Sequence, residues 1–482
     1  MESKIEKRLR NFQKPNLTGT EFKRQKYAVQ LRKKKRTEAQ NHFRYNKASL
    51  DTTIEMDIGP TESGEENESF LFSIPELIES LDELKNLDLI NLEISLNYLK
   101  NILSSKDAPI KDFVLAGLIP KILPFTSSIY NTKIRYLAFW IFCNISSTND
   151  TYCEEQILKY NIINLFLEAI CEKNEEINEN PLWGLSNLLA DSEKFCSNIL
   201  SKNFLSKVLE LLNRTQNSRI YSLVAWCMNN VCHFESLLDL QMTELVLKIC
   251  EKILEHPIPK TKKRILHIIG VLIRSDNEKV EVFLNSPIFQ SSFTYWSNPL
   301  YYFELVKISA NICSGDHRQT QKMLDLGILD LMYMLIDNED EGIAYTTYWL
   351  LSNVAAGRPK QLIFLESHVV FYKALNGLLS LNEKIKVEVS FIIRNFMKQA
   401  SDELKKKLIT DKFMEGIIEA LKFINPEFII NLLTVFEGYI SIRGKFEFLD
   451  KQYNCIIESL QKHRNEDVYT MCEKILESVA NY

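Results

Sequence analysis

The feature that most constrains this chain is a tryptophan followed four residues later by an asparagine, a pair that returns about every 42 residues. Within each of two groups the interval between successive pairs is 42 or 43 residues, which is the period of solenoids made of stacked helical units. Positions i and i+4 of a helix lie on one face, so we expect the pairs to form a ladder with one rung per repeat. The rungs are Trp140/Asn144, Trp183/Asn187, Trp226/Asn230, Lys307/Asn311, Trp349/Asn353 and Phe391/Asn395, in which Lys307 and Phe391 replace the tryptophan.

A glycine or asparagine precedes most rungs by 22 or 23 residues, namely Gly117, Asn161, Asn203 and Gly327. These two residue types best tolerate the left-handed backbone that ends a helix. Each unit is therefore predicted as a short helix, a second helix, a sharp turn and a longer helix that carries the rung. Gly416 is expected to open a similar segment near the end of the chain, and no strands are expected.

One rung is missing. The unit between Trp226 and Lys307 should place its pair near residues 267 and 271, where the chain has His267 and Val271. The ladder is thus predicted to divide into a first group (140–230) and a second group (307–395).

Composition gives no support for catalysis or for a metal site. The ten cysteines are scattered without a Cys-x-x-Cys pair, which favours reduced thiols over disulfides, and the seven histidines form no His-x3-His pair. We find no phosphate-binding glycine loop, no nucleophile elbow and no apolar run of 18 or more residues. The sequence predicts a binding protein, with no enzyme activity and no cofactor.

Charge separates the N-terminal end from the rest of the chain. Residues 1–50 hold 15 Lys/Arg against four Asp/Glu, whereas the whole chain has a net charge of −5. Residues 51–80 follow with nine acids and neither Lys nor Arg, a composition typical of a linker. Charge alone leaves three hypotheses for the basic arm: a nucleic-acid tail, a nuclear localisation sequence, and a helix that binds an acidic partner.

Several motifs together resemble one family, importin α, the adaptor for nuclear import. The arm resembles the importin-β-binding domain through Arg8–Phe12 and Val29–Arg36, and the body resembles the family's armadillo repeats through Gly117–Lys121, Trp183–Asp191, Ser352–Arg358 and Asn465–Tyr469. The resemblance implies an all-α, right-handed armadillo-repeat solenoid of about ten repeats with a basic N-terminal arm. It predicts a basic arm at 1–48, an acidic flexible linker at 49–80 and the solenoid at 81–482.

The resemblance also implies a function and its sites. The concave groove would bind lysine-rich nuclear localisation signals, mono- or bipartite, with asparagine amides on the peptide backbone and tryptophans against the lysine stems. The implied partners are cargo proteins, importin β and an export receptor of the CAS type, without a small-molecule substrate or membrane insertion, and the protein would shuttle between cytoplasm and nucleus. The expected major site is Trp140, Asn144, Trp183, Asn187, Asp191, Trp226 and Asn230; the minor site is Lys307, Asn311, Trp349, Asn353, Glu388, Phe391 and Asn395; the importin-β-binding residues are Arg8, Arg10, Lys23, Arg24, Arg32, Lys33, Lys34, Lys35 and Arg36.

Alternatives remain open at this point. A lone tryptophan on an apolar helix face is usually core, and Asp191 or Glu388 taken singly would more often be surface acids. A cytoskeletal scaffold of the β-catenin type, or a nucleic-acid-binding protein that uses the arm, are the competing functions. The arm also departs from the family, because His42-Phe43-Arg44 stands where a second basic cluster is expected.

Overall fold

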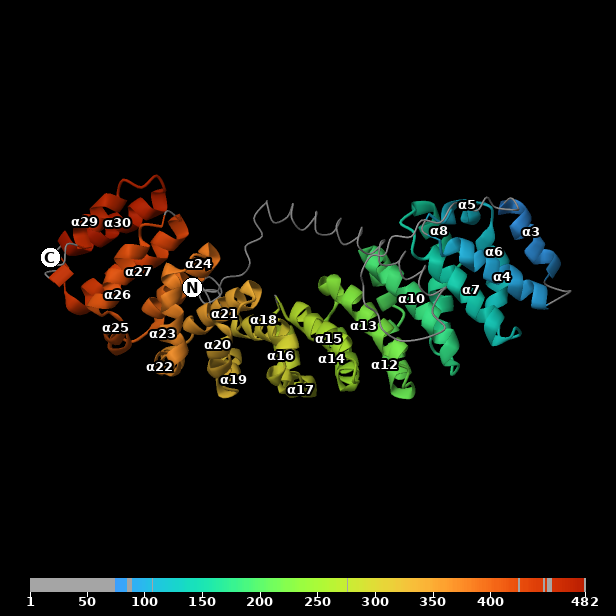
Figure 1. Cartoon of the computed structure of the whole chain (residues 1–482), viewed down its shortest axis with the longest axis horizontal. Helices are drawn as coiled ribbons and strands as arrows, with labels where there is room; N and C mark the ends of the chain where they lie inside the picture. Colours follow the sequence, from blue (N-terminus) through green and yellow to red (C-terminus); the bar gives the residue numbers. More distant parts are fainter. Residues whose placement is uncertain are drawn as a thin grey trace. The chain divides into compact units, whose positions relative to one another are not determined.

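The computed structural model describes residues 74–84, 89–105, 107–274, 276–423, 425–444, 447–448 and 453–480, and every regular element among them is a helix. Helices carry the labels of Figure 1. The predictions for the basic arm and for most of the linker concern residues 1–73 and lie outside the described residues. The first described helix begins at Ile74, seven residues before the predicted start of the solenoid.

The described residues fall into two compact units that divide between Ile268 and Ile269, inside one helix. The helices of the unit before this division are α3 (Ile74–Leu84), α4 (Leu89–Leu103), α5 (Ile110–Leu115), α6 (Leu118–Ile122), η1 (Leu123–Thr126), α7 (Thr132–Ile145), α8 (Thr151–Lys159), α9 (Ile162–Ala169), α10 (Glu175–Asp191), α11 (Glu193–Leu200), α12 (Phe204–Arg214), α13 (Ser218–His233), η2 (Glu235–Leu237), α14 (Leu240–Glu255) and most of α15 (Pro259–Leu272).

The second unit continues the same succession of short and long helices. Its helices are α16 (Asn277–Leu284), α17 (Pro287–Phe293), η3 (Thr294–Ser297), η4 (Pro299–Tyr301), α18 (Tyr302–Cys313), α19 (His317–Asp325), α20 (Ile328–Leu335), α21 (Glu341–Ala355), α22 (Pro359–Ser367), α23 (Val369–Leu375), η5 (Asn376–Leu379), α24 (Glu383–Gln399), α25 (Asp402–Leu408), α26 (Asp411–Ala420), α27 (Pro426–Arg443), α29 (Tyr453–Leu460) and α30 (Glu466–Ala480). The prediction of an all-α repeat solenoid is confirmed.

The predicted left-handed residues do occur, but the turn lies elsewhere in the repeat. Gly117, Asn161, Asn203 and Gly327 all have positive φ, between 55° and 88°. Each stands directly before the second helix of its repeat, as Asn161 stands between α8 and α9. The sharp turn therefore joins the first and second helices, and the prediction that it follows the second helix was wrong. An extended or capped segment makes the second connection instead.

The prediction for Gly416 was also wrong. This glycine lies inside α26, and its backbone is not left-handed. The sharp connection before α26 is made by Ile409 and Thr410, and the side chain of Thr410 caps the helix by accepting from Phe413 N at 3.2 Å. A glycine alone was thus a poor guide to the repeat boundary at this end.

A second periodic signal fixes where the rung-bearing helices begin. An Asn or Asp stands nine residues before each rung, and its side chain accepts a hydrogen bond from a backbone N–H of the helix that follows. For five rungs that helix carries the rung, whereas Asn298 caps the short helix η4 that leads into α18. Such caps stabilise a helix start by about 0.5–2 kcal/mol. The position nine residues before His267 is Ile258, so the missing rung lacks its cap as well. The capping residues are Asn131, Asn174, Asn217, Asn298, Asp340 and Asn382.

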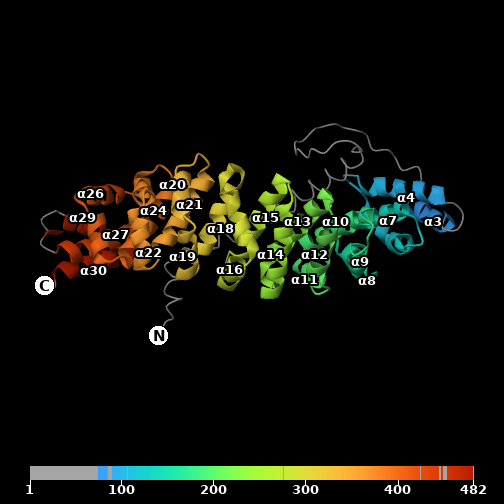
Figure 2. The same ribbon diagram turned by 90° about the horizontal axis from the view of Figure 1, so that it is seen from below.

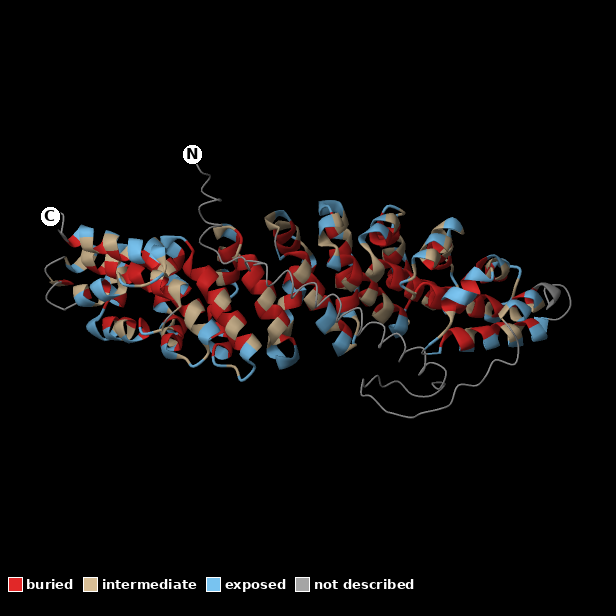
Figure 3. Ribbon diagram, turned by 90° about the horizontal axis from the view of Figure 1, so that it is seen from above, coloured by how far each residue is buried: buried red, intermediate tan, exposed pale blue. Residues whose placement is uncertain are grey.

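Rung-bearing helices of successive repeats pack side by side within each unit. In one unit α10 packs against both α7 and α13, and in the other α21 packs against α18 and α24 (Figures 1 and 2). Most residues of the rung-bearing helices are buried, whereas exposed residues lie mainly on the shorter helices and at the helix ends (Figure 3). Gly184 of α10 permits one close contact, because a Cβ there would lie 2.5 Å from the ring of Phe166.

Among the described residues no single helix is long and apolar enough to cross a membrane. Two consecutive helices, Pro359–Ser367 and Val369–Leu379, would together be long and apolar enough by length and composition alone, but the chain bends by 81° between them.

Candidate functional site: the asparagine ladder

The asparagines of the ladder are buried, and each donates a hydrogen bond to the preceding repeat. Their exposed fractions lie between 1% and 8%. Five of the six donate to a backbone carbonyl inside the corresponding helix of the preceding repeat, which for Asn311 is α15, where the rung is missing. Asn144, whose predecessor is α4, donates to Ser104 Oγ at 3.0 Å. The other bonds are Asn187 to Cys143 O (3.2 Å), Asn230 to Ser186 O (2.9 Å), Asn311 to Gly270 O (2.8 Å), Asn353 to Ala310 O (3.2 Å) and Asn395 to Ser352 O (3.0 Å).

These bonds give the asparagines a structural role that the sequence argument did not anticipate. One amide N–H of each asparagine ties two repeats together, at a net value of about 0.5–1.5 kcal/mol. The register repeats as well. In four of the five bonds to a carbonyl, the accepting residue stands just before the previous asparagine, and in the fifth Gly270 stands just before Val271, at the missing rung. The ladder is therefore the seam along which neighbouring repeats are joined.

Small residues mark the positions where the next asparagine approaches. Cys143, Ser186, Gly270, Ala310 and Ser352 each offer the accepting carbonyl, and none has a large side chain. A bulky residue there would crowd the incoming helix.

Two larger residues occupy the same position, and neither receives a ladder asparagine. Asn229 precedes Asn230, and the next repeat has Val271 at the position of the ladder asparagine. Arg394 precedes Asn395, and the next repeat has Glu437 and Gly438 there. A small residue at this position of one repeat is thus a sequence signal for an asparagine in the next repeat. This signal is present in the sequence, but it was not among the predictions.

The amides retain capacity for a ligand. An asparagine side chain has two N–H donors and an acceptor oxygen. For Asn230, Asn311, Asn353 and Asn395, every hydrogen bond of the side chain within the described part of the chain involves the nitrogen Nδ2. Their oxygens Oδ1 are left to accept a hydrogen bond from another molecule.

The tryptophans of the ladder differ in exposure. Trp140 and Trp183 are 5% and 4% exposed, whereas Trp226 and Trp349 are half-buried. Trp140 already holds a cation of this chain, because Lys100 Nζ lies 4.7 Å from the centroid of its ring. Burial lowers the pKa of Lys100. A lysine on a ladder tryptophan is therefore compatible with the fold, although the role of these rings as pocket walls stays a prediction.

Asp191 ends α10, in line with Trp183 and Asn187. The eight residues between Trp183 and Asp191 span about 12 Å along the helix axis. Asp191 is half-buried, and no ion pair or hydrogen bond of its side chain occurs among the described residues. A carboxylate at a helix C-terminus interacts unfavourably with the helix dipole, so Asp191 does not stabilise the end of α10.

Glu388 lies within the second group of rungs and is 2% exposed. Tyr345 Oη donates to its Oε1 and Ser352 Oγ to its Oε2, both at 3.2 Å. Burial raises the pKa of Glu388 to about 8, and the two hydrogen bonds oppose the rise. A cation brought next to this carboxyl group would favour its ionised form.

The two altered rungs are also placed in the ladder. Lys307 is half-buried on α18, with Nζ 6.0 Å from the centroid of the Phe303 ring. Phe391 is 5% exposed on α24 and belongs mainly to the core. The first unit holds the three rungs of the predicted major site together with Asp191. The second holds the three rungs of the predicted minor site together with Glu388.

Comparison with known proteins identifies the class first. An engineered protein of known crystal structure has a TM-score of 0.68 over 84% of this chain and 98% of its own, at 14% identity. A structure reported with the interaction between cadherin and β-catenin has a TM-score of 0.62 over 85% of this chain and 83% of its own, at 9% identity. Both likenesses concern the fold alone. The chain is an all-α repeat solenoid with the fold of armadillo-repeat proteins.

The sequence relatives are more specific, and they are importin subunits alpha. Importin subunit alpha-1b of Oryza sativa subsp. japonica is 20% identical over 54% of this chain and 49% of its own length. Importin subunit alpha-6 of Arabidopsis thaliana is 22% identical over 56% and 52%, and importin subunit alpha-2 of Caenorhabditis elegans is 22% identical over 52% and 48%. No family model matches the chain.

The chain thus spans about half the length of the curated relatives it matches. The resemblance to importin α found in the sequence is confirmed at this level. These relatives are named as importin subunits, and none of the three names is that of an enzyme.

Proposed function

We propose that this chain is a nuclear import adaptor whose asparagine ladder holds an extended, lysine-rich segment of a cargo protein. The asparagine oxygens would accept from the backbone N–H groups of the segment and fix its register without reading its sequence. The acids at the ladder would select lysine. The similarity to importin subunits alpha supports this function.

The observation that carries the proposal is the position of Asp191. Its half-buried carboxylate lies one turn beyond Asn187 and has no cationic partner among the described residues. A lysine ammonium of a peptide held by Asn187 would supply that partner. A charge-assisted hydrogen bond of this kind contributes about 1.5–3 kcal/mol.

The second group of rungs would form a weaker site. Only one of its rungs keeps the tryptophan, and Lys307 adds a cation that repels a basic peptide. Glu388 is protonated at neutral pH in the free protein, so a lysine must also displace its proton. We therefore expect the minor site to bind more tightly as the pH rises towards 8.

The remaining partners follow from the resemblance, and the arm residues among their expected contacts lie outside the described residues. The basic arm, with Arg8, Arg10, Lys23, Arg24 and Arg32–Arg36, would recruit importin β. The final helices would contact an export receptor of the CAS type, and the protein would shuttle between cytoplasm and nucleus.

A peptide titration tests the adaptor function. A fluorescent lysine-rich localisation peptide is titrated into the full chain, into Asp191→Asn and into Glu193→Gln, an exposed acid two residues further on. We expect Asp191→Asn to weaken binding by about ten-fold or more, and Glu193→Gln to leave it nearly unchanged. Equal affinity of all three proteins would remove Asp191 from the site.

A scaffold of the β-catenin type is the alternative, and the fold similarity to the structure reported with the cadherin–β-catenin interaction fits it. Such a scaffold would prefer an acidic peptide. The same titration with an acid-rich peptide separates the two functions, because an adaptor of the proposed kind should bind it at least ten-fold more weakly than the lysine-rich peptide.

A further inference from the structure

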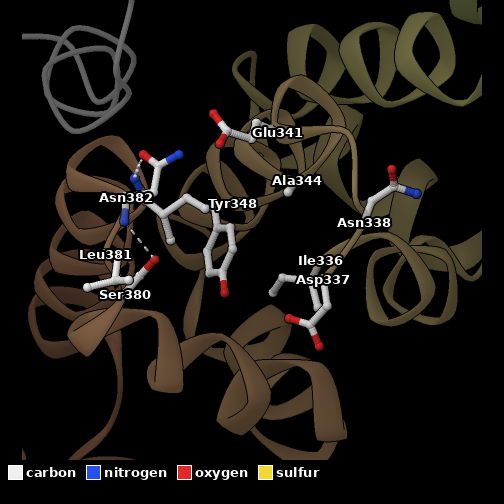
Figure 4. A pocket seen from close by; sticks show the side chains of 10 residues that line it. Ile336, Asp337, Asn338, Glu341, Ala344, Tyr348, Ser380, Leu381 and Asn382 are labelled. Atoms are coloured by element: carbon white, nitrogen blue, oxygen red, sulfur yellow. Dashed lines mark hydrogen bonds between the residues drawn. The ribbon is translucent and has the colours of Figure 1, made fainter.

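A pocket of about 480 Å³ lies in the second unit, away from the ladder asparagines. It is lined by residues of the α20–α21 connection, the first half of α21 and the η5–α24 connection (Figure 4). Glu341, at the start of α21, stands twelve residues before Asn353, about 18 Å along the helix. The volume falls within the roughly 300–1,000 Å³ of ligand sites.

The pocket combines acids with apolar surface. Asp337 and Glu341 supply two carboxylates, of which Asp337 pairs with Lys373 at 2.8 Å and Glu341 has no ion pair in the described part of the chain. One negative charge is thus left over at the rim. The apolar lining comes from Ile336, Ala344, Leu381 and Ile385, together with the ring of Tyr348.

Tyr348 is the second sign of a ligand. Its side chain is only 4% exposed, yet its hydroxyl group makes no hydrogen bond within the described residues. Figure 4 shows its ring in the middle of the pocket, with the hydroxyl group directed toward Asp337 and away from Glu341. Burial and the charge of Asp337 raise the pKa of Tyr348 to about 12, so the hydroxyl group stays neutral and its oxygen can accept an N–H.

Leu381 points to the shape of the ligand. Its side chain is fully exposed at the edge of the pocket, although it is a large apolar residue. An aliphatic stem that lies across Leu381 and Ile385 would cover this surface and place its polar end near the carboxylates.

Other ligand classes fit less well. An anion would meet Asp337 and Glu341, and the helix N-termini that could attract it are already capped by Asp340 and Asn382. No group of three His, Cys, Asp or Glu side chains suited to a metal ion occurs among the described residues.

We propose that this pocket binds an alkylammonium group, with the ammonium at the Tyr348 hydroxyl group beside Asp337, the charge of Glu341 attracting it from the rim, and the aliphatic stem against Leu381 and Ile385. The same chemistry is offered by a lysine side chain of a peptide and by a free alkylamine. The pocket is separate from the ladder, so this inference does not depend on the proposed adaptor function.

Methyl NMR of the full chain, labelled at isoleucine and leucine methyl groups, tests the proposal. The probes are Nα-acetyl-lysine N-methylamide, n-butylamine and the uncharged Nα-acetyl-norleucine N-methylamide. We expect the lysine amide to shift the Ile336, Leu381 and Ile385 methyl signals and the norleucine amide to leave them in place. Stronger binding of the lysine amide than of butylamine would assign the pocket to peptides, and equal binding would assign it to alkylamines in general.

Three variants complete the test. Glu341→Gln should weaken binding of the lysine amide by about two- to five-fold, as for an exposed ion pair. Tyr348→Phe should weaken it by about two- to ten-fold. Glu339→Gln, an exposed acid of the same connection that does not line the pocket, is the matched control and should bind as the natural chain does. Equal shifts with the norleucine amide, or unchanged affinity in both Glu341→Gln and Tyr348→Phe, would overturn the assignment.

Discussion

Replacing Glu388 by glutamine should remove a specific dependence of stability on pH. The folded chain holds the Glu388 proton up to a pKa of about 8, whereas the unfolded chain releases it near the ordinary value of 4.5. The folded state therefore binds more protons across this window, and stability must fall as the pH rises through it. Above pH 8 both states are ionised and the slope disappears.

The magnitude follows from the width of the window. Each pH unit costs about 1.4 kcal/mol while the folded state keeps the proton and the unfolded state does not. Over the window between 4.5 and 8, Glu388 alone lowers the free energy of unfolding by about 5 kcal/mol. Glutamine has nearly the same shape and cannot ionise, so Glu388→Gln should lack this loss.

Denaturant unfolding followed by helical circular dichroism at pH 5, 6, 7, 8 and 9 measures the difference. The midpoint of the natural chain should fall relative to that of Glu388→Gln between pH 5 and 8 and then run parallel to it. Glu383→Gln, an exposed acid at the start of the same helix, is the control and should follow the natural chain. Identical pH profiles for Glu388→Gln and the natural chain would refute the assignment of a buried, protonated carboxyl group.

Three further predictions concern the ladder. Asn353→Ala loses the bond to the Ala310 carbonyl but gains helix propensity, so denaturant unfolding should show a net destabilisation of about 1 kcal/mol or less; a loss above about 3 kcal/mol would mean that more than this bond was removed. Ala310→Leu should cost about 1–3 kcal/mol by the same measurement, because Asn353 approaches there, whereas Asn229→Leu, where no ladder asparagine approaches, should stay within about 0.5 kcal/mol; equal costs would argue against the small-residue rule. Binding of a lysine peptide to the second group of rungs should tighten between pH 7 and 8 and lose this dependence in Glu388→Gln, as measured by calorimetry; a flat profile in the natural chain would contradict the proton displacement.

The repeat and its ladder could be predicted because the signals are periodic. A pair that returns every 42 or 43 residues fixes both the phase and the face of the helices, whatever the intervening sequence does. The missing rung at His267 and Val271 was identified on the same ground.

The double role of the asparagines could not be predicted from the rungs alone. Their bonds join residues 40 to 44 positions apart, and a single sequence does not show which carbonyl comes within reach. The order of turns within a repeat was missed for a related reason. A left-handed residue marks a helix end, but its spacing from the rung does not say which of two short helices has ended.

The exposure of individual side chains could not be predicted from the sequence either. Trp183 and Trp226 occupy equivalent positions, yet the first is 4% exposed and the second is half-buried. The pocket around Tyr348 is formed by two helix–helix connections that lie about 40 residues apart in the sequence, and no sequence motif predicts it.

The most direct test of the central claim is a charge-exchange cycle between Asp191 and the peptide. The affinities of the natural chain and of Asp191→Lys are measured for a lysine-rich peptide and for the same peptide with its central lysine changed to glutamate. The account predicts that the exchanged pair recovers affinity, with a coupling energy of about 1.5–3 kcal/mol between the two positions. A coupling energy near zero would show that the ladder joins the repeats but does not hold the cargo lysine at Asp191.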